Sequence, residues 1–370
     1  MGVGRVDLDN RASYQHLDPA GMLDFAHGFP AQVVEAAEIG RGFALPWVFN
    51  PRQVVLAGMG GSAAVGDFLA RLSEPVSLLP MVVCRNYEIP AFVGPDTLFI
   101  ACSHSGDTEE TLAAATAAKR RGARIVCITT DGKLQRFARR HRKDGVVLLQ
   151  IPRADPPMPP RAALGYLFIP LVCLFGSLGL CSGVDQGMRE VVPLLERLRA
   201  SAGPGVRTAR NRAKRLATHL FGKIPWIQGT AGIMSAVAYR WRCQFNENSK
   251  ALAYSGEYPE LNHNEVVGWE LAEGLGERIE VVVLRSPGDH WRNRARVDIT
   301  KRKLIGRKAN VGVIDARGET PLAQLLWMTY LGDFTSLYLA FLNGVNPAST
   351  DSIGVLKRDL ARLGRPRQLR

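Results

Sequence analysis

Short apolar runs alternate with amphipathic stretches along the first 150 residues of the chain. Five of these runs have the length and the β-branched composition of buried strands: 53–57, 78–83, 97–101, 124–129 and 146–150. The stretches between them predict helices over 62–72, 108–121 and 133–142. Connections of this length join parallel strands, so the pattern predicts an α/β fold in which helices flank a parallel sheet.

The same alternation returns after a proline-rich segment. Residues 151–163 hold five prolines, which interrupt regular structure, and a helical region to about residue 219 follows. Further strands are then expected over 224–229, 278–285 and 308–315. Helices are expected over 231–245, 290–304 and 320–342. The two halves therefore predict two domains of similar α/β architecture.

These patterns divide the chain into four parts. An N-terminal domain is expected over 1–155, and a linker with interface helices over 156–219. A C-terminal domain is expected over 220–347, followed by a C-terminal helix over 348–370.

Residues 162–184 contain no charged side chain and are numerous enough to cross a bilayer. The segment also contains Pro170 and four glycines, and nothing else in the chain resembles a span. A helix that is apolar all round is equally typical of one buried between domains or subunits. We therefore predict a buried interface helix and no membrane association.

Charge and cysteine content indicate which partners and which cellular compartment to expect. The net charge is +13, and arginine dominates the basic runs. These runs largely lack interleaved aromatic residues, so we interpret them as solvated helix faces that attract anionic small substrates, with no nucleic-acid partner. Six scattered cysteines without a C-x-x-C pair, and no sign of a secretory signal, favour the cytoplasm.

A glycine-rich turn follows the first predicted strand. VVLAGMGGSA (54–63) places Gly58, Gly60 and Ala63 in a G-x-G-x-x-A pattern, which is typical of dinucleotide-binding sites. The acid expected about 20 residues later is missing, because the second strand leads to Arg85 instead. An NADP site or a tight strand-to-helix turn both remain compatible with this pattern.

A second loop, CSHSGDTEETL (102–112), surrounds one glycine with three hydroxyl side chains after another predicted strand. Both loops end strands of the same sheet, where ligands bind in doubly wound folds. Hydroxyl groups and the N–H groups at helix N-termini bind anions. Together the two loops predict a phosphate site.

Four stretches in order resemble one family. GMGGSAAVGD and SHSGDTEETL resemble the glycine and serine loops of the sugar isomerase (SIS) fold. PPRAALGY (159–166) and NENSKALAYSGEYPELNHNEVVGW (246–269) are similar to later motifs of the bifunctional phosphoglucose/phosphomannose isomerases. The resemblance runs from about residue 53 to LKRDL near the C-terminus. It implies two SIS domains, and a metal-free enzyme without a cofactor that interconverts glucose 6-phosphate and mannose 6-phosphate with fructose 6-phosphate.

The resemblance also implies binding residues. By position in the motifs, Ser103, Ser105 and Thr108 would hold the phosphate. Gly61 and Ser62 would lie close to the sugar.

Catalytic residues follow from the same motifs. Arg161 would face the reacting carbons, and Glu247 would be the base. His263 would reach in from the partner subunit of a homodimer with shared active sites. The C-terminal helix would contribute Lys357, with Thr350 at the position tied to mannose activity.

The chemistry of aldose–ketose isomerisation suits these residue types. Ring opening needs a general acid–base such as His263 or Lys357. One carboxylate can carry a proton between C2 and C1 through an enediol, and a fixed cation such as Arg161 stabilises the negative charge that develops on oxygen. From the sequence alone, Glu257, Glu260 and Glu265 are rival bases to Glu247.

The chain departs from the family pattern in both loops. Ala63, Ala64 and Val65 stand where glycines are common, and His104 and Asp107 replace the usual Tyr and Asn. Asp107 would oppose phosphate binding unless its carboxylate points away.

Two other functions are compatible with parts of the sequence. A non-catalytic SIS protein that senses a phosphosugar would need the serine loop but not Glu247 and His263. An NADP-dependent dehydrogenase would use the 58–63 turn. The remaining histidines have no metal-ligand spacing, which argues against a zinc-dependent mannose phosphate isomerase.

Overall fold

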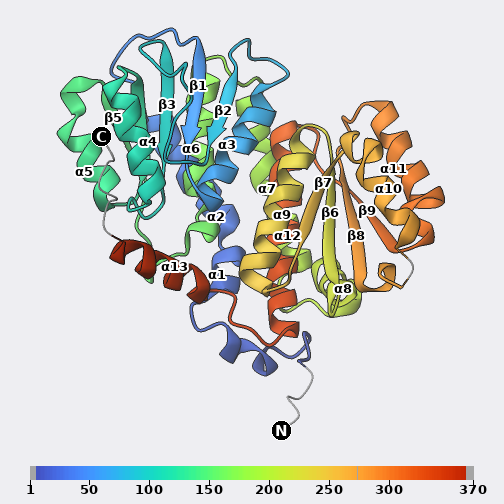
Figure 1. Cartoon of the computed structure of the whole chain (residues 1–370). Helices are drawn as coiled ribbons and strands as arrows, with labels where there is room; N and C mark the ends of the chain where they lie inside the picture. The colour runs from blue at the N-terminus through green and yellow to red at the C-terminus, as the bar shows by residue number, and fades with distance from the viewer. Residues whose placement is uncertain (1–5, 273, 364–370) are drawn as a thin grey trace.

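A computed structural model describes residues 6–272 and 274–363 of the chain. Two parallel sheets lie side by side, and α7, α9 and α12 lie between them (Figure 1). The first sheet has the order β2-β1-β3-β4-β5 and the second the order β7-β6-β8-β9. The predicted α/β fold with two parallel sheets flanked by helices is confirmed.

The first sheet matches the predicted strands within a few residues. Its strands are β1 (Gln53–Ala57), β2 (Met81–Cys84), β3 (Thr97–Cys102), β4 (Arg124–Thr129) and β5 (Val146–Gln150). All six residues of β3 are buried, because helices cover both faces of the sheet. Val54 of β1 pairs with Leu98 of β3, and Ala57 pairs with Ala101, so both strands end at the same edge.

The second sheet contains one strand that the pattern did not reveal. Its strands are β6 (Ile224–Thr230), β7 (Tyr254–Tyr258), β8 (Ile279–Arg285) and β9 (Asn310–Asp315). Strand β7 lies at the edge of the sheet, is mostly half-buried and contains Gly256. It therefore lacks the continuous apolar run by which the other strands were predicted.

Helices complete both halves. Those of the first half are α1 (Met22–His27), α2 (Phe29–Gly42), α3 (Gly60–Ser73), α4 (Glu109–Arg120), α5 (Gly132–Arg140), α6 (Leu164–Ser177) and α7 (Val184–Ala202). Those of the second half are α8 (Arg212–Leu220), α9 (Ile233–Ser249), α10 (Glu265–Gly268), α11 (Trp291–Lys303), α12 (Pro321–Leu342) and α13 (Asp351–Arg362). Helices α1, α2 and α10 had not been predicted.

One apolar core joins the two halves. It includes residues of both sheets and of α2, α3, α6, α7, α9 and α12. A smaller core lies under α4 and α5 on the outer face of the first sheet, and another lies under α11 on the outer face of the second. The inner layers of the two halves are thus packed against each other.

The two most apolar helices are both buried. Helix α6 occupies most of the uncharged 162–184 segment and packs on α2, α3 and α7, which confirms the predicted burial. The expectation that no other segment resembles a membrane span was wrong, because α12 is also long and apolar enough to cross a bilayer by length and composition. However, 89% of its apolar 18-residue stretch is buried inside the protein. A helix apolar all round is expected at such a place.

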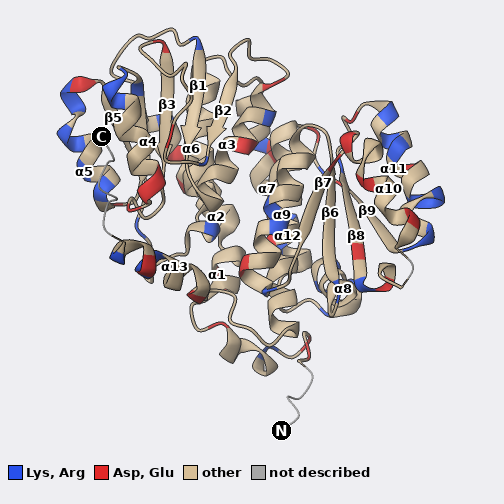
Figure 2. Ribbon diagram, viewed as in Figure 1, with Lys and Arg blue, Asp and Glu red and all other residues tan. Residues whose placement is uncertain are grey.

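The basic residues lie mainly on the outside of the molecule. Figure 2 shows Lys and Arg gathered on α5 and α11, at opposite sides of the view. Helix α5 has a buried face at Leu134 and Ala138 and ends with Arg139 and Arg140. These basic runs therefore lie on the outer helix layer, as the pattern indicated.

Candidate active site

The glycine turn after β1 is packed tightly between neighbouring strands and helices. A side chain at Gly58 would lie 3.0 Å from the carbonyl oxygen of Cys102, at the end of β3. Helix α3 begins at Gly60, and Ser62 in its first turn is buried. The apolar residues Ala63, Ala64 and Val65 are also buried, so they anchor this helix start to the core.

The serine loop after β3 is closed by its own hydroxyl groups. The Oγ of Ser103 lies 2.9 Å from the Oγ1 of Thr108 and accepts a hydrogen bond from the Gly106 amide. Thr108 is the N-cap residue of α4, but its side chain does not cap the helix. The first N–H groups of α4 are thus left available to an anion. Ser105 is exposed beside them.

A neighbouring loop fixes the shape of the serine loop. Gly106 has φ +70°, and a side chain there would lie 1.8 Å from the Asp131 carbonyl oxygen. The Leu134 amide donates to the Gly106 carbonyl at 2.8 Å. The Thr130 hydroxyl donates to the His104 carbonyl at 2.8 Å. The loop is therefore held rigidly before any ligand binds.

The two unusual residues of this loop are Asp107, which was expected to oppose phosphate binding unless its carboxylate points away, and His104. The Asp107 carboxylate accepts a hydrogen bond from the Lys133 amide at 3.1 Å, so it points toward the start of α5. Burial lowers the pKa of His104 to about 4, which leaves the imidazole neutral at pH 7.

Arg161 connects the first half of the chain to the second. It lies in a short 3-10 helix, Pro160–Ala162, whose backbone packs against Gly61. Its side chain is only 5% exposed, and its Nη1 lies 3.5 Å from Oε2 of Glu247. Its Nε donates to Asn248 Oδ1 at 2.6 Å. The cation and the carboxylate predicted to act on the sugar are therefore brought together.

A buried polar network holds this arginine. Arg240 of α9 donates to the Arg161 carbonyl at 3.0 Å and pairs with Asp333 of α12 at 3.2 Å. Burial raises the pKa of Asp333, while Arg240 and a hydrogen bond from Gln244 oppose that shift. Sequence reasoning missed these supporting residues, because Asp333 lies inside an otherwise apolar helix.

Glu247 lies in the last turn of α9, not in a loop. The helix had been predicted to end at residue 245 and continues to Ser249. Lys250 ends it in the left-handed conformation, at φ +51°. Partial burial and the nearby Arg161 lower the pKa of Lys250 to about 8, and Asp351 and Glu247 oppose the shift. Lys250 therefore remains charged at pH 7.

The C-terminal residues approach the site through one segment. Residues 346–349 accept hydrogen bonds from Arg161 and Lys250. Thr350 follows as the N-cap residue of α13, and Lys357 is exposed on that helix. Figure 1 shows α13 beneath the first sheet, at the left of the view.

His263 lies away from Glu247 within one chain. Helix α9 leads from the carboxyl end of β6 to the amino end of β7, so Glu247 is at the amino edge of the second sheet. His263 follows the carboxyl end of β7, in the 3-10 helix Glu260–His263. Five residues of strand separate these edges by about 16 Å.

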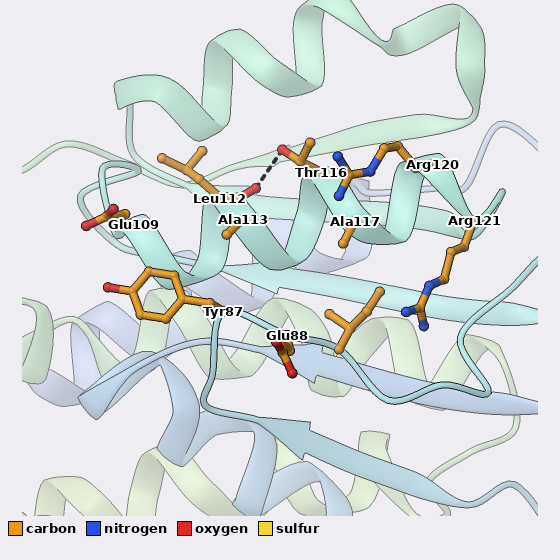
Figure 3. Close-up of a pocket in the computed structure, with 10 residues that line it drawn as sticks. Tyr87, Glu88, Glu109, Leu112, Ala113, Thr116, Ala117, Arg120 and Arg121 are labelled. Atoms are coloured by element: carbon orange, nitrogen blue, oxygen red, sulfur yellow. Dashed lines mark hydrogen bonds between the residues drawn. The ribbon is translucent and has the colours of Figure 1, made fainter. Parts of the chain in front are cut away.

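The cavity in Figure 3 is separate from the Arg161–Glu247 cluster, because neither residue lines it. It has a volume of about 740 Å³ and lies between α4 and the segment after β2. Tyr87 and Arg121 line it, and Glu109 stands where it approaches the serine loop. Among the described residues, no group of three or more His, Cys, Asp or Glu side chains is placed to bind a metal ion.

Comparisons with known proteins identify the family. Residues 48–143 match the SIS domain model, and residues 209–360 match the model of the bacterial phospho-glucose isomerase C-terminal SIS domain. The chain is 42% identical to a bifunctional phosphoglucose/phosphomannose isomerase of Caldicellulosiruptor bescii, over 92% of this chain and 99% of the relative. The chain belongs to the bifunctional phosphoglucose/phosphomannose isomerase family. It is an isomerase with two SIS domains.

Other relatives agree with this assignment. A bifunctional phosphoglucose/phosphomannose isomerase of Aquifex aeolicus is 32% identical, over 83% of this chain and 90% of the relative. A crystal structure of a glucose-6-phosphate isomerase like protein from Thermus thermophilus superposes with a TM-score of 0.59, covering 93% of this chain and 98% of that one. At 23% identity, the structural match supports the fold alone. The family resemblance inferred from the four sequence stretches is confirmed. The glycine turn at 58–63 is therefore part of a sugar-phosphate isomerase and not of the alternative dehydrogenase.

Proposed function

We propose that this isomerase interconverts glucose 6-phosphate and mannose 6-phosphate with fructose 6-phosphate, without a metal ion. The observation that carries the proposal is the Arg161–Glu247 pair, 3.5 Å apart, with Arg161 packed against the glycine turn at Gly61. A carboxylate that transfers a proton and a cation that stabilises an oxyanion are the two groups an enediol mechanism needs at adjacent carbons.

The phosphate would bind at the serine loop. Ser103, Ser105 and Thr108 would donate their hydroxyl hydrogens to it, together with the first N–H groups of α4. Gly61 and Ser62 would border the sugar, because the backbone of Gly61 packs against Arg161. This arrangement would bring the sugar toward Glu247.

The reaction would proceed by proton transfers between protein and sugar. His263 or Lys357 would exchange a proton with the ring oxygen, and the ring would open to the free aldehyde. Glu247 would remove the C2 proton, which leaves an enediolate with its negative charge on O1. The hydroxyl proton of O2 would pass to O1, and Glu247 would return its own proton to C1, which gives the ketose. Arg161 would stabilise the charge on oxygen in both steps.

The direct test is a coupled assay of the recombinant protein with each of the two aldose phosphates, in the presence of EDTA. We expect fructose 6-phosphate from both, at rates that EDTA does not change, because every step uses a protein side chain. Failure to form fructose 6-phosphate from either sugar would contradict the proposed function. A rate abolished by EDTA and restored by a divalent ion would contradict the metal-free mechanism.

We further propose a homodimer in which His263 acts in the active site of the partner. The opposite placement of Glu247 and His263 at the two edges of the second sheet supports this. Thr350 would affect the activity toward mannose 6-phosphate from the start of α13, with Lys357 further along the same helix.

Mixing two inactive variants tests the shared site. In a heterodimer of Glu247→Gln and His263→Ala chains, one of the two sites would contain both native residues. Random exchange should therefore restore about a quarter of the native activity. Native mass spectrometry would establish the exchange. Absence of recovery in a sample with proven heterodimers would contradict the shared site.

A further inference from the structure

Four consecutive carbonyl groups precede α13, and two cations bind all of them. Lys250 Nζ donates to the carbonyl oxygens of Asn346 at 2.6 Å and Ser349 at 2.8 Å. Arg161 Nη2 donates to those of Pro347 at 2.5 Å and Ala348 at 3.0 Å. Residues 346–349 are therefore attached to the end of α9 and to Arg161 through their backbone.

Lys250 also binds the helix that carries Glu247. Its Nζ donates to the Glu247 carbonyl oxygen at 2.9 Å. A lysine ammonium group has three hydrogens, and these three carbonyls are its nearest acceptors, with the Asn248 carbonyl further away at 3.5 Å. The carbonyls at a helix C-terminus carry partial negative charge, which favours a cation there. One side chain thus joins the last turn of α9 to both ends of the 346–349 segment.

The position of α13 depends on this attachment. The helix buries none of its own residues. The ion pair between Arg362 and Asp359 lies within the helix, and the Ser349 hydroxyl donates to the Asp351 carboxylate at 2.8 Å from the segment before it. What sets its place relative to the site is therefore largely the segment 346–349 that leads into it.

We propose that Lys250 is a positioning residue that fixes the start of α13 against the helical turn carrying Glu247. This inference rests on the proposed function of the site. Lys250 holds the carbonyls of Asn346 and Ser349, which flank the two carbonyls held by Arg161. It thereby sets where Thr350 and Lys357 stand relative to Glu247, the proposed base. Misplacement of catalytic groups by about 1 Å can cost 10²-fold in rate. Within the described part of the chain, the hydrogen bonds of Lys250 go to α9 and to residues 346–349 and not to the serine loop, so substrate capture should not depend on it.

The Lys250→Gly variant separates positioning from folding. Glycine accepts the left-handed backbone at this position without strain, so the helix end should form and the protein should stay folded. We expect kcat for glucose 6-phosphate to fall about tenfold or more, with KM within about twofold of the native value. Arg161 still binds the carbonyls of Pro347 and Ala348 in this variant, so kcat should fall less than it does when the base Glu247 is replaced. Hydrogen exchange should become faster over residues 346–356.

Two further variants complete the test. Lys250→Met keeps the length of the side chain without its charge and should show the same loss of kcat. Lys303→Met removes an exposed lysine of α11 and should leave kcat and exchange unchanged.

A folded Lys250→Gly protein with native kcat would overturn the proposal. So would a loss of kcat with unchanged exchange over residues 346–356. If the native chain does not isomerise either sugar phosphate, the proposed function fails, whereas the exchange comparison still decides whether Lys250 holds the segment.

Discussion

Replacing Glu247 by glutamine is expected to lower kcat about 10³-fold or more, because the amide cannot accept the proton from C2. The side chain keeps its shape, and its oxygen can still face Arg161. The hydroxyl groups and the helix N-terminus proposed to bind phosphate are untouched. Binding of 6-phosphogluconate, measured by titration calorimetry, should therefore stay close to native while turnover is lost.

Glu257→Gln is the matched control among the rival bases. Glu257 pairs with Arg71 at 3.4 Å, away from the Arg161 cluster. Its replacement should leave kcat close to native. Native turnover in the Glu247→Gln protein would show that Glu247 is not the base, and a larger loss in Glu257→Gln would move that role to Glu257.

Replacing Gly106 by alanine is expected to have the largest effect on stability. Alanine in the left-handed region costs about 1 to 3 kcal/mol, and the new methyl group would meet the Asp131 carbonyl. Relieving that clash would separate the serine loop from its neighbour, at a further cost of about 1 to 3 kcal/mol. We expect urea unfolding to show the loss of stability, and KM for the sugar phosphates to rise about tenfold or more because the hydroxyl groups are displaced.

Gly179→Ala provides the control for backbone strain alone. Gly179 has the same φ of +70°, and a side chain there would meet nothing within 4 Å. Replacing Gly179 should lower stability only by the cost of placing alanine in the left-handed region, and KM should stay unchanged. Equal losses of stability in the two variants would contradict the packing of Gly106 against Asp131.

The sequence predicted the fold well where burial is continuous. Strands β3 and β4 are covered on both faces, so almost all their residues are apolar and the runs stand out. Strand β7 was missed because it lies at a sheet edge and is mostly half-buried. The last turn of α9 was missed because Asn246, Glu247 and Asn248 are polar, although Asn248 is buried by contacts to Arg161 and Ser336.

The sequence predicted which stretches contribute to the candidate site, but not how these stretches contact one another. Residue types, the glycine turns and their order along the chain indicated the phosphate loop, the base and the arginine. The direction of the Asp107 carboxylate could not be predicted, since its partner is an amide of the next helix, at Lys133. The attachment of 346–349 to Lys250 joins residues 96 and 99 positions apart, and no local pattern encodes it.

The two-domain α/β class, most of its strands and helices and the chemical types at the site were determined by the sequence alone, because periodicity and turn residues act over a few positions. The tertiary structure alone decided that Arg161 faces Glu247, that Asp107 turns away from the serine loop, and that His263 stands at the opposite edge of its sheet from Glu247. The physical reason is that these relations depend on how distant segments pack. Packing joins side chains and carbonyl groups that local sequence leaves independent of one another.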